Sequence, residues 1–412
     1  MNLLIVSQYF WPEDFRINDL AVGLKKRGHD VTVLTGLPNY PMGKLFSGYD
    51  YRRRREEDFH GVKILRVPLV PRGAGSRVQL ALNYLSFAVA ASLLGPKLCR
   101  EKYDAIFVYE ISPITVGIPA IVLKALKKVP IHFWVQDLWP ESLSAADAVQ
   151  SPLILKIVGR MVRFIYGQCD HILVQSRGFI PRVAALNRKG LPITYFPNWA
   201  EDIYRRPLSG GEALPRLPDG LRLMFAGNIG AAQDFGTLLS AAEALKSEPG
   251  IRWVVLGEGR QFAWAQDQVR KRGLEDRVSF LGRHPVEAMP GYFAAADAML
   301  VTLKPDPIFS LTIPSRIQTY MASGRPIIAM LNGEGARVVM EADAGLTCAA
   351  GDAAGLVRAV RAFKLLTAEE RVAMGRRGRD YYDAHFSRGR ALDQAEGWLM
   401  KIPEGGDDGL QR

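Results

Sequence analysis

The sequence has few of the residues that build disulfide frameworks or metal sites. Its 412 residues include three cysteines and six histidines. Cys99, Cys169 and Cys348 lack the spacing of a zinc or redox motif, and the histidines occur singly. We therefore expect no metal ion and no cofactor, and this cysteine usage is typical of a reducing cytoplasm.

The sequence also lacks the segments that mark a dehydrogenase or a secreted protein. The first apolar run, residues 3–6, is not followed by the G-x-G-x-x-G pattern of dinucleotide-binding enzymes. No basic segment precedes a hydrophobic run at the N-terminus, so we expect no signal peptide. These absences argue against a dehydrogenase and predict a cytoplasmic protein.

Positive charge is concentrated in the first half of the chain. Residues 1–200 contain 26 Lys and Arg against 15 Asp and Glu, whereas residues 201–412 contain 27 of each kind. The first half therefore carries the whole net charge of +11. We expect this half to meet an anionic partner.

Residues 79–96 form an uncharged stretch that follows four arginines at 52–55. Its length is at the lower limit for a membrane span, and Asn83, Ser86 and Ser92 reduce its hydrophobicity. We predict a buried or bilayer-facing helix rather than a spanning one. Basic residues beside an apolar helix favour peripheral attachment to the inner face of the cell membrane. The alternative is a core helix next to a solvated arginine loop.

Strand and helix patterns alternate along both halves of the chain. The order strand, loop, helix, strand at the N-terminus predicts a parallel sheet with right-handed crossovers, and the same order resumes at residues 223–226. We predict an α/β fold with two Rossmann-like domains, residues 1–203 and 221–384, whose sheets face across a cleft. Prolines and glycines among charged residues place the linker at 204–220.

The stretch Asp306-Pro-Ile-Phe-Ser-Leu-Thr-Ile-Pro-Ser-Arg316 predicts a helix start that binds phosphate. Pro314 fits the first helical turn, and Ser310 and Thr312 could accept hydrogen bonds from first-turn amides. Free N–H groups, the helix dipole and the Arg316 guanidinium would together attract a phosphate. The alternative is an ordinary helix cap with a solvated arginine.

Glycines follow the predicted strands of the second half. They are Gly227, Gly230, Gly257, Gly259 and Gly282. Each allows the backbone to approach a ligand closely, although one such glycine commonly marks no more than a tight turn. Several of them beside a Pro-Ser-Arg helix start predict nucleotide binding.

Acidic residues at the ends of first-half strands are candidates for catalysis. Asp137 follows an uncharged strand, residues 131–135, and at that sheet edge it could accept the proton of an attacking hydroxyl. Its alternative role is the N-cap of the next helix. Glu110 and Glu141 are further candidates, and Glu13 is either a contact for an acceptor hydroxyl or a solvated residue.

Six motifs along nearly the whole chain resemble glycosyltransferase family 4. They are Tyr9-Phe-Trp-Pro-Glu13, Gly28-His-Asp-Val-Thr-Val33, Pro38-Asn-Tyr-Pro41, Asp137-Leu-Trp-Pro-Glu141, Phe196-Pro-Asn-Trp199 and Ile313-Pro-Ser-Arg316 with Tyr320-Met-Ala-Ser-Gly-Arg-Pro326. The branch they resemble contains the amino-sugar and fucosamine-type transferases of bacterial O-antigen and capsule assembly. The resemblance implies a GT-B fold, an acceptor domain followed by a nucleotide-sugar domain, a final helix at 385–403 that crosses back, and a retaining, metal-independent transfer.

The resemblance also implies positions for the site residues. Those expected to bind the donor are Gly227, Asn228, Ile229, Gly230, Gln233, Gly257, Gly259, Arg260, Arg283, His284, Ser310, Leu311, Thr312, Ile313, Pro314, Ser315, Arg316 and Thr319. Those expected to bind the acceptor are Glu13, Phe15 and Glu110. Asp137 falls near the place where many relatives have a His or Asp beside the anomeric carbon.

Some positions depart from the family pattern. Leu311 and Thr319 stand where the family commonly has a pair of glutamates, and Ala231 and Gln233 stand where it commonly has an Arg/Lys pair. We therefore assign neutralisation of the donor diphosphate to Arg316. The reserve candidates are Arg260 and Lys304.

These observations predict a glycosyltransferase that moves a sugar, with an N-acetylated amino sugar as one candidate, from a UDP-sugar to a lipid-pyrophosphate-linked saccharide. A sugar-nucleotide 2-epimerase of the same architecture is one alternative, although it would need no acceptor site. A non-enzymatic protein that binds anionic surfaces is the other. We expect no nucleic-acid partner, because the basic residues are not interleaved with aromatic ones in the pattern of RNA-binding proteins.

Overall fold

The computed structural model describes most of the chain. The described residues are 1–52, 55–145, 151–206 and 215–400. Residues 207–214 of the predicted linker and residues 401–403 of the predicted final helix lie outside them, as do two of the four arginines at 52–55.

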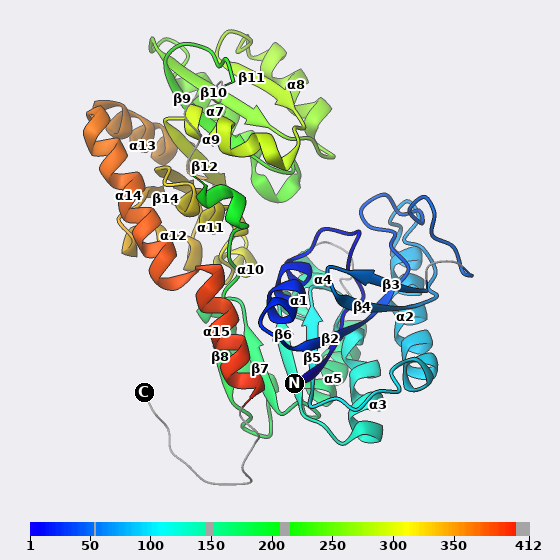
Figure 1. Ribbon diagram of the computed structural model, residues 1–412. Helices are drawn as coiled ribbons and strands as arrows, with labels where there is room; N and C mark the ends of the chain where they lie inside the picture. The colour runs from blue at the N-terminus through cyan, green and yellow to red at the C-terminus, as the bar shows by residue number, and fades with distance from the viewer. Residues whose placement is uncertain (53–54, 146–150, 207–214, 401–412) are drawn as a thin grey trace. The chain divides into compact units, whose positions relative to one another are not determined.

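The chain divides into two compact units, each built around its own β-sheet (Figure 1). Unit 1 consists of Met1–Gln175, Ile180–Phe196 and the chain from Ala391 onward. Unit 2 consists of Ser176–Phe179 and Pro197–Arg390. The predicted α/β fold with two Rossmann-like domains is confirmed.

Unit 1 contains an eight-stranded sheet with the strand order β3-β4-β2-β1-β5-β6-β7-β8. Its strands are β1 (Asn2–Val6), β2 (Asp30–Gly36), β3 (Glu56–Phe59), β4 (Val62–Val67), β5 (Ala105–Glu110), β6 (Ile131–Val135), β7 (His171–Val174) and β8 (Ile193–Tyr195). Strands β1, β5 and β6 are almost wholly buried, which explains why they read as continuous apolar runs. Within the described residues, every strand pairing in this sheet is parallel except that of the edge strand β3 with β4.

Helices cover both faces of this sheet. They are α1 (Arg16–Lys26), α2 (Arg77–Leu98), α3 (Gly117–Lys127), α4 (Glu141–Ala145), α5 (Pro152–Tyr166), α6 (Ile180–Leu186) and α15 (Arg388–Leu399), the last belonging to unit 1 from Ala391. Right-handed crossovers place α1 on one face and the row α2, α3, α5, α6 on the other, and neighbours in this row pack together. Helix α15 joins the α1 side, because Arg27 at the end of α1 pairs with Asp393 and Glu396 at 2.6 and 2.9 Å.

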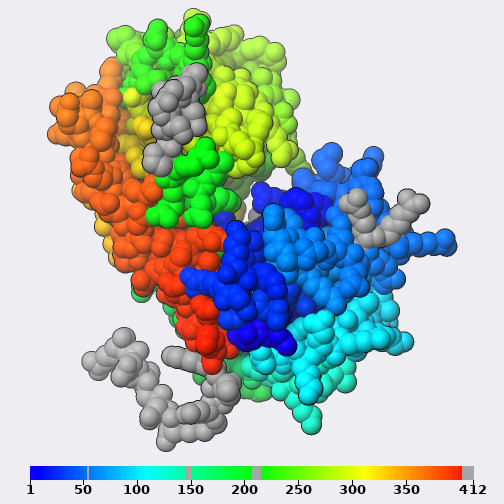
Figure 2. Space-filling view, viewed as in Figure 1, coloured from blue at the N-terminus to red at the C-terminus, as the bar shows by residue number. Residues whose placement is uncertain are grey.

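Helix α2 contains the uncharged stretch 79–96. Ser76 and Gln79 form a capping box at its N-terminus. Asn83, Phe87 and Ala91 lie on its buried side, whereas other apolar side chains of the same helix are exposed. Helix α2 is therefore neither a fully buried core helix nor fully solvated, and the segment that contains it lies at the surface of unit 1 (Figure 2).

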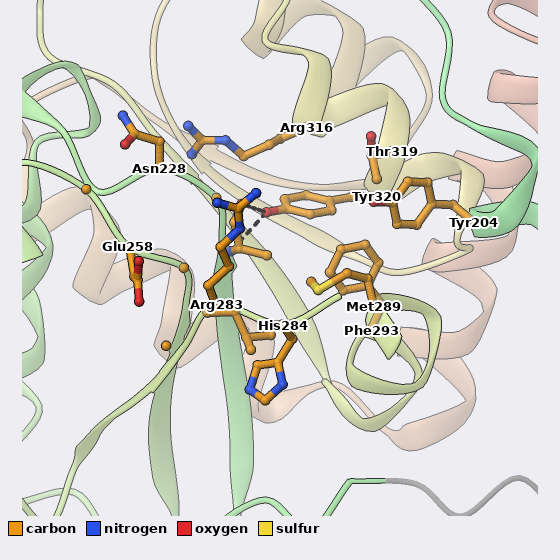
Figure 3. A pocket seen from close by; sticks show the side chains of 16 residues that line it. Tyr204, Asn228, Glu258, Arg283, His284, Met289, Phe293, Arg316, Thr319 and Tyr320 are labelled. Atoms are coloured by element: carbon orange, nitrogen blue, oxygen red, sulfur yellow. Dashed lines mark hydrogen bonds between the residues drawn. The ribbon is translucent and has the colours of Figure 1, made fainter. Parts of the chain in front are cut away.

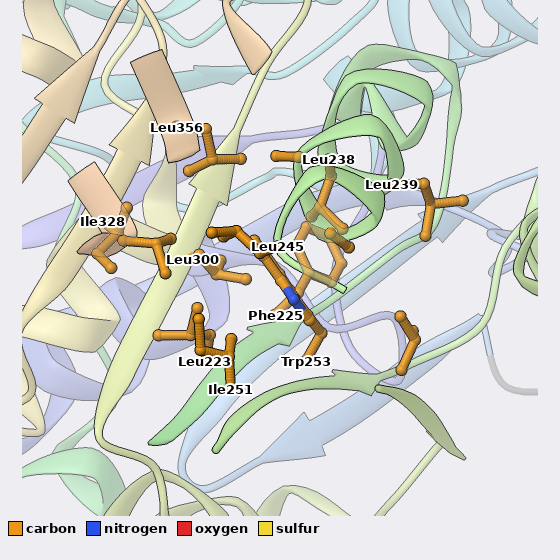
Figure 4. Close-up of a cluster of buried hydrophobic side chains, with 14 of the residues drawn as sticks. Leu223, Phe225, Leu238, Leu239, Leu245, Ile251, Trp253, Leu300, Ile328 and Leu356 are labelled. Atoms are coloured by element: carbon orange, nitrogen blue, oxygen red, sulfur yellow. The ribbon is translucent and has the colours of Figure 1, made fainter. Parts of the chain in front are cut away.

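Unit 2 contains a six-stranded sheet with the order β11-β10-β9-β12-β13-β14. The strands are β9 (Leu221–Ala226), β10 (Ile251–Leu256), β11 (Val278–Gly282), β12 (Ala298–Thr302), β13 (Ile327–Met330) and β14 (Gly345–Cys348). The helices are α7 (Phe235–Ala244), α8 (Phe262–Lys271), α9 (Met289–Ala295), α10 (Pro307–Ser310), α11 (Ser315–Ala322), α12 (Glu334–Glu341), α13 (Ala353–Leu365) and α14 (Ala368–His385). Leu223, Phe225 and Trp253 of the sheet pack against Leu238 of α7 and Leu356 of α13 in one buried cluster (Figure 4). This core fixes the strand ends that carry the glycine turns.

Candidate functional site

A cavity of about 540 Å³ lies at the carboxyl ends of β9, β10 and β11 in unit 2 (Figure 3). The residues that line it are Tyr204, Ala226, Gly227, Asn228, Leu256, Gly257, Glu258, Gly259, Gly282, Arg283, His284, Met289, Phe293, Arg316, Thr319 and Tyr320. The carboxyl ends of parallel strands are where open α/β sheets bind their ligands. The cavity therefore has the location of a nucleotide site.

The glycine turns bring the ends of β9 and β10 into close backbone contact. Gly227 and Gly257 have φ angles of +139° and +127°, which side-chain-bearing residues rarely adopt. A Cβ atom at Gly257 would overlap the carbonyl oxygen of Gly227, and a Cβ atom at Gly227 would lie 3.2 Å from Nε of Arg316. These two glycines are thus required by the shape of the cavity wall.

Arg316 is the cation best placed to meet an anionic ligand in this cavity. Its guanidinium stacks over the ring of Phe225, with 4.7 Å between the guanidinium carbon and the ring centroid. Its buried Nη1 has no hydrogen-bond partner, and no carboxylate pairs with Arg316 in the part of the chain that the structure describes. Burial lowers the pKa of this guanidinium, although the nearby Tyr320 partly opposes the change. A desolvated cation without a protein partner is suited to binding phosphate.

Tyr320 holds the helix of Arg316 against the sheet. Its hydroxyl donates to the carbonyl oxygen of Ala226 at 3.0 Å and accepts from the Ala226 amide at 3.2 Å. These bonds join α11 directly to the end of β9. The register of Arg316 relative to Gly227 is therefore fixed by a fully buried side chain.

The start of α11 differs from the sequence prediction. The helix begins at Ser315, Pro314 occupies the N-cap position, and no side chain caps the first turn. Ser310 and Thr312 instead donate to the carbonyl oxygens of Pro307 and Ile308. The predicted capping by these two hydroxyls is wrong, because the short helix α10 offers them nearer carbonyl acceptors.

An aromatic wall closes another side of the cavity. Tyr204 stacks on Phe293 with 5.5 Å between ring centroids, and Phe293 meets Tyr320 edge to face. His284 contacts the carbonyl oxygen of Leu281 and the hydroxyl of Tyr292. Flat apolar surfaces beside polar groups are suited to a nucleoside base.

The predicted donor residues fall into two groups. Those that line the cavity are Gly227, Asn228, Gly257, Gly259, Arg283, His284, Arg316 and Thr319. Those outside its lining are Ile229, Gly230, Gln233, Arg260, Ser310, Leu311, Thr312, Ile313, Pro314 and Ser315. Ile229 and Ile313 are core residues, and the side chain of Gln233 accepts a hydrogen bond from the Gly230 amide. Arg260 and Lys304, the reserve cations, are exposed and do not line the cavity.

Sequence reasoning missed several lining residues. They are Tyr204, Ala226, Leu256, Glu258, Met289, Phe293 and Tyr320. Glu258 stands between two glycines that we singled out, so its place in that turn was a usable signal. Tyr204, Met289 and Phe293 come from segments that carry no local motif, and their convergence depends on the tertiary fold.

Asp137 lies after β6 in unit 1, beside two polar groups. It accepts a hydrogen bond from the Ser112 hydroxyl at 2.8 Å. Burial raises the pKa of Asp137 to about 6, and the bond from Ser112 partly offsets that increase. Burial also raises the pKa of Glu110 well above its usual value, and the neighbouring Asp137 charge adds to this effect. Asp137 is therefore largely ionised at neutral pH, beside a Glu110 carboxyl whose pKa burial shifts upward.

The three predicted acceptor residues occupy different environments. Glu13 is buried, and its carboxylate accepts from the amides of Phe10, Asn39 and Tyr40, so the alternative of a solvated Glu13 is wrong. Burial raises the pKa of Glu13 to about 7, against the opposing effect of these amides. Glu110 is fully buried as well. Neither carboxyl is presented at the surface: Glu13 binds the amides of the loops around it, and the buried carboxyl oxygens of Glu110 have no hydrogen-bond partner among the described residues.

Phe15 belongs to an aromatic cluster with an arginine above it. Its ring stacks on Tyr9 and lies 5.3 Å from Tyr40, measured between centroids. The guanidinium of Arg72 lies over Tyr40 and donates to the Tyr9 hydroxyl at 3.0 Å. None of the ion pairs among the described residues involves Arg72. The cluster therefore combines aromatic rings with a positive charge that no described carboxylate neutralises.

The two Rossmann-like units, with a cavity at the strand ends of unit 2, have the architecture of the GT-B fold. A model of the "Glycosyl transferase 4-like domain" matches residues 15–199, and a model of "Glycosyl transferases group 1" matches residues 220–364. The chain therefore belongs to the glycosyltransferases, with one characteristic domain in each half.

Two relatives agree with this assignment. "Probable glycosyltransferase WbjE" of Pseudomonas aeruginosa is 28% identical over 55% of this chain, and the match spans 58% of the length of WbjE. WcaI of Escherichia coli (strain K12), a glycosyl transferase named for colanic acid biosynthesis, is 24% identical over 79% of this chain and 82% of its own length.

Solved structures show the same fold. Sucrose-phosphate synthase from Thermosynechococcus elongatus superposes with a TM-score of 0.75 at 18% identity, covering 96% of this chain and 97% of that one. Anabaena HepE in complex with UDP and glucose superposes with a TM-score of 0.68 at 15% identity, covering 97% and 99%.

Proposed function

We propose that this chain is a retaining glycosyltransferase that transfers a sugar from a UDP-sugar to a lipid-pyrophosphate-linked saccharide in the assembly of a bacterial surface polysaccharide. The observation that carries the proposal is Arg316, a partly buried guanidinium beside the glycine turn at Gly227, with its buried Nη1 unpartnered. A sugar nucleotide would supply the missing negative charge through its diphosphate.

The choice of UDP follows from the cavity and from one structural neighbour. The cavity offers aromatic side chains for a base on one side and Arg316 for phosphates on the other (Figure 3). HepE, which has the same fold, was solved with UDP and glucose. These observations support UDP as the carrier of the donor sugar.

The acceptor side of the proposal depends on unit 1. The rings of Phe15 and Tyr40, backed by the buried Tyr9, provide surface for a saccharide, and Arg72 provides a positive charge for a pyrophosphate. We assign to the Asp137 carboxylate the uptake of the proton from the acceptor hydroxyl, since it is ionised above about pH 6.

The polymer and the sugar are inferred from likeness. WcaI is named for colanic acid biosynthesis, which supports a role in bacterial polysaccharide assembly. The motifs around Asp137 and Arg316 resemble amino-sugar and fucosamine-type transferases of O-antigen and capsule assembly. We therefore propose an N-acetylated amino sugar as the first candidate to test.

Two measurements on the purified protein test this function. A thermal-shift panel of UDP-, GDP-, dTDP- and ADP-sugars should show stabilisation by one UDP-sugar, because a ligand that binds the folded state raises its stability. Labelled sugar from that donor should then appear on a lipid-pyrophosphate-linked saccharide and not on the free saccharide. Stabilisation by another nucleotide class would overturn the donor assignment, and transfer to free sugars alone would overturn the acceptor assignment.

A further inference from the structure

We propose that the outer face of the helix row α2, α3 and α5 docks onto an anionic lipid bilayer, at the inner face of the cell membrane. This inference deepens the proposed function, because a lipid-linked acceptor would be held in that bilayer. All the residues involved belong to unit 1, and their arrangement requires no bound sugar.

Helix α2 has two opposite sides. Its buried residues pack into unit 1, while five large apolar residues on the other side are exposed at intervals of three or four residues, as expected of one helical stripe. The exposed residues are Val78, Leu82, Leu85, Val89 and Leu93. A stripe of this length is more than the scattered single exposures that water-exposed surfaces tolerate.

Helix α5 repeats this arrangement. Gly159, Val162 and Ile165 are buried on its inner side. The exposed apolar residues of α5 are Leu153, Ile154, Ile157 and Phe164. Leu126 on α3, the helix packed between α2 and α5, adds one more.

The exposed sides of these helices point the same way. The connections from β4 to β5, β5 to β6 and β6 to β7 all cross the sheet in one direction, so right-handed crossovers put α2, α3 and α5 on one face. Since each helix buries its inner side against the sheet or its neighbours, the opposite sides form the outer surface of one layer. The apolar residues of three helices are thereby gathered on one face of unit 1.

The charges on this layer match an anionic surface. Helices α2, α3, α5 and α6 contain no Asp or Glu. Their basic residues are Arg77, Lys97, Lys124, Lys127, Lys156, Arg160, Arg163 and Arg182, of which Lys124 is paired with Asp170 of the neighbouring loop. On the opposite side of the sheet, α1 and α15 carry both signs: Asp19, Asp393 and Glu396 stand beside Arg16, Lys25, Lys26, Arg388 and Arg390. Apolar residues together with a one-signed basic layer favour an anionic bilayer as the occupant.

The geometry indicates that α2 lies along the membrane rather than across it. By length and composition this helix could span a bilayer, with a mean hydropathy of 1.5. However, Phe87 and Ala91 are fully buried in unit 1, and Asn83 donates to the carbonyl oxygen of Val70 at 2.7 Å. A spanning α2 would have to leave this packing, whereas a helix lying in the interface keeps it.

Vesicle flotation of the full chain, without any sugar, tests the proposal. The vesicles contain phosphatidylcholine alone or an equal mixture with phosphatidylglycerol. The wild type should float with the mixed vesicles and not with the neutral ones. Leu85→Ser with Val89→Ser on α2, and Ile157→Ser with Phe164→Ser on α5, should each lower the bound fraction by about tenfold. Val372→Ser is the matched control on unit 2, since Val372 and Val89 are 59% and 57% exposed, and it should float like the wild type.

A charge variant completes the test. Lys156→Gln with Arg160→Gln should reduce flotation with the mixed vesicles several-fold, and added salt should reduce the wild type in the same way. UDP binding is measured on every variant, and its retention shows that unit 2 is intact and keeps this test separate from the proposed transfer reaction.

Three results would overturn the assignment of this face as a membrane-docking surface. The wild type could stay unbound with anionic vesicles at low salt. The α2 and α5 variants could float as well as the wild type. Sedimentation could show that the wild type self-associates and that these same variants are monomeric, in which case the face joins copies of the chain.

Discussion

Replacement of Arg316 by Gln tests the most specific part of the proposed donor site. Gln keeps the first part of the side-chain stem but removes the guanidinium that lies over Phe225, and with it the positive charge. A charge-assisted hydrogen bond contributes about 1.5–3 kcal/mol, and about 1.4 kcal/mol corresponds to a tenfold change in affinity. Because Arg316 lies in a cavity and not on the open surface, solvent screening should reduce this effect little. We expect UDP to bind about 10- to 150-fold more weakly to the variant.

Comparing UDP with uridine shows which part of the ligand depends on Arg316. Titration calorimetry with UDP and with uridine, at one ionic strength, separates the diphosphate from the nucleoside. Arg316→Gln should weaken UDP binding and leave uridine binding within about twofold of the wild type. Arg260→Gln is the control, since Arg260 is exposed and does not line the cavity, and it should leave both affinities unchanged.

If Arg316→Gln weakened the binding of uridine and of UDP equally, the assignment of diphosphate binding to Arg316 would be refuted. The arginine would then act through the shape of the cavity. The assignment would also be refuted if Arg260→Gln weakened UDP more than Arg316→Gln did. The melting temperature of each variant shows whether the fold survives, because the Tyr320 bonds to Ala226 hold α11 independently of the guanidinium.

Two further predictions concern unit 1. Transfer activity should fall as the pH drops below about 6, because Asp137, whose pKa is raised to about 6, is then protonated and cannot accept the proton. Ser112→Ala removes a bond that favours the carboxylate, so the decline in the pH–activity profile should move to higher pH, and an unmoved profile would exclude Asp137 as the titrating base. Glu57→Ala should lower the free energy of unfolding in urea by about 3–5 kcal/mol, because it strands the charge of the fully buried Arg66. Glu56→Ala, at the exposed neighbouring position, should cost less than about 1 kcal/mol, and equal losses would contradict this account.

The regular part of the fold could be predicted because its signals are local. The buried parallel strands β1, β6 and β12 are short apolar runs between loops, and the sequence places β6 at residues 131–135, where the structure has it. The glycine turns after β9 and β10 were also visible. Their positive φ angles belong to the local backbone, and glycine is the residue that usually adopts such angles.

The hairpin of β3 and β4 was missed because its stability is tertiary. Glu56–Phe59 reads as a polar loop, yet it pairs antiparallel with β4 at the sheet edge. His60 and Gly61 both have positive φ angles, which is the geometry of a two-residue hairpin turn, and the glycine at 61 was a usable signal in the sequence. In the sequence, the charged Arg66 argues against a buried strand at this position. Only the structure shows that Glu57 pairs with it. Strands β8 and β14 were missed as well, since each has three or four residues that are half buried.

Arg66, which is fully buried, and Arg316, which is partly buried, show how ion-pair partners distinguish a structural charge from one that is available to a ligand. Arg66 has Glu57 at 2.7 Å and donates to the carbonyl oxygen of Trp11, so the protein itself satisfies its charge. Arg316 faces a cavity and has no carboxylate partner among the described residues, although a desolvated charge without a partner costs stability. The sequence shows two arginines in similar apolar surroundings and cannot distinguish them. The fold distinguishes them, because one guanidinium is already neutralised and the other still requires an anion.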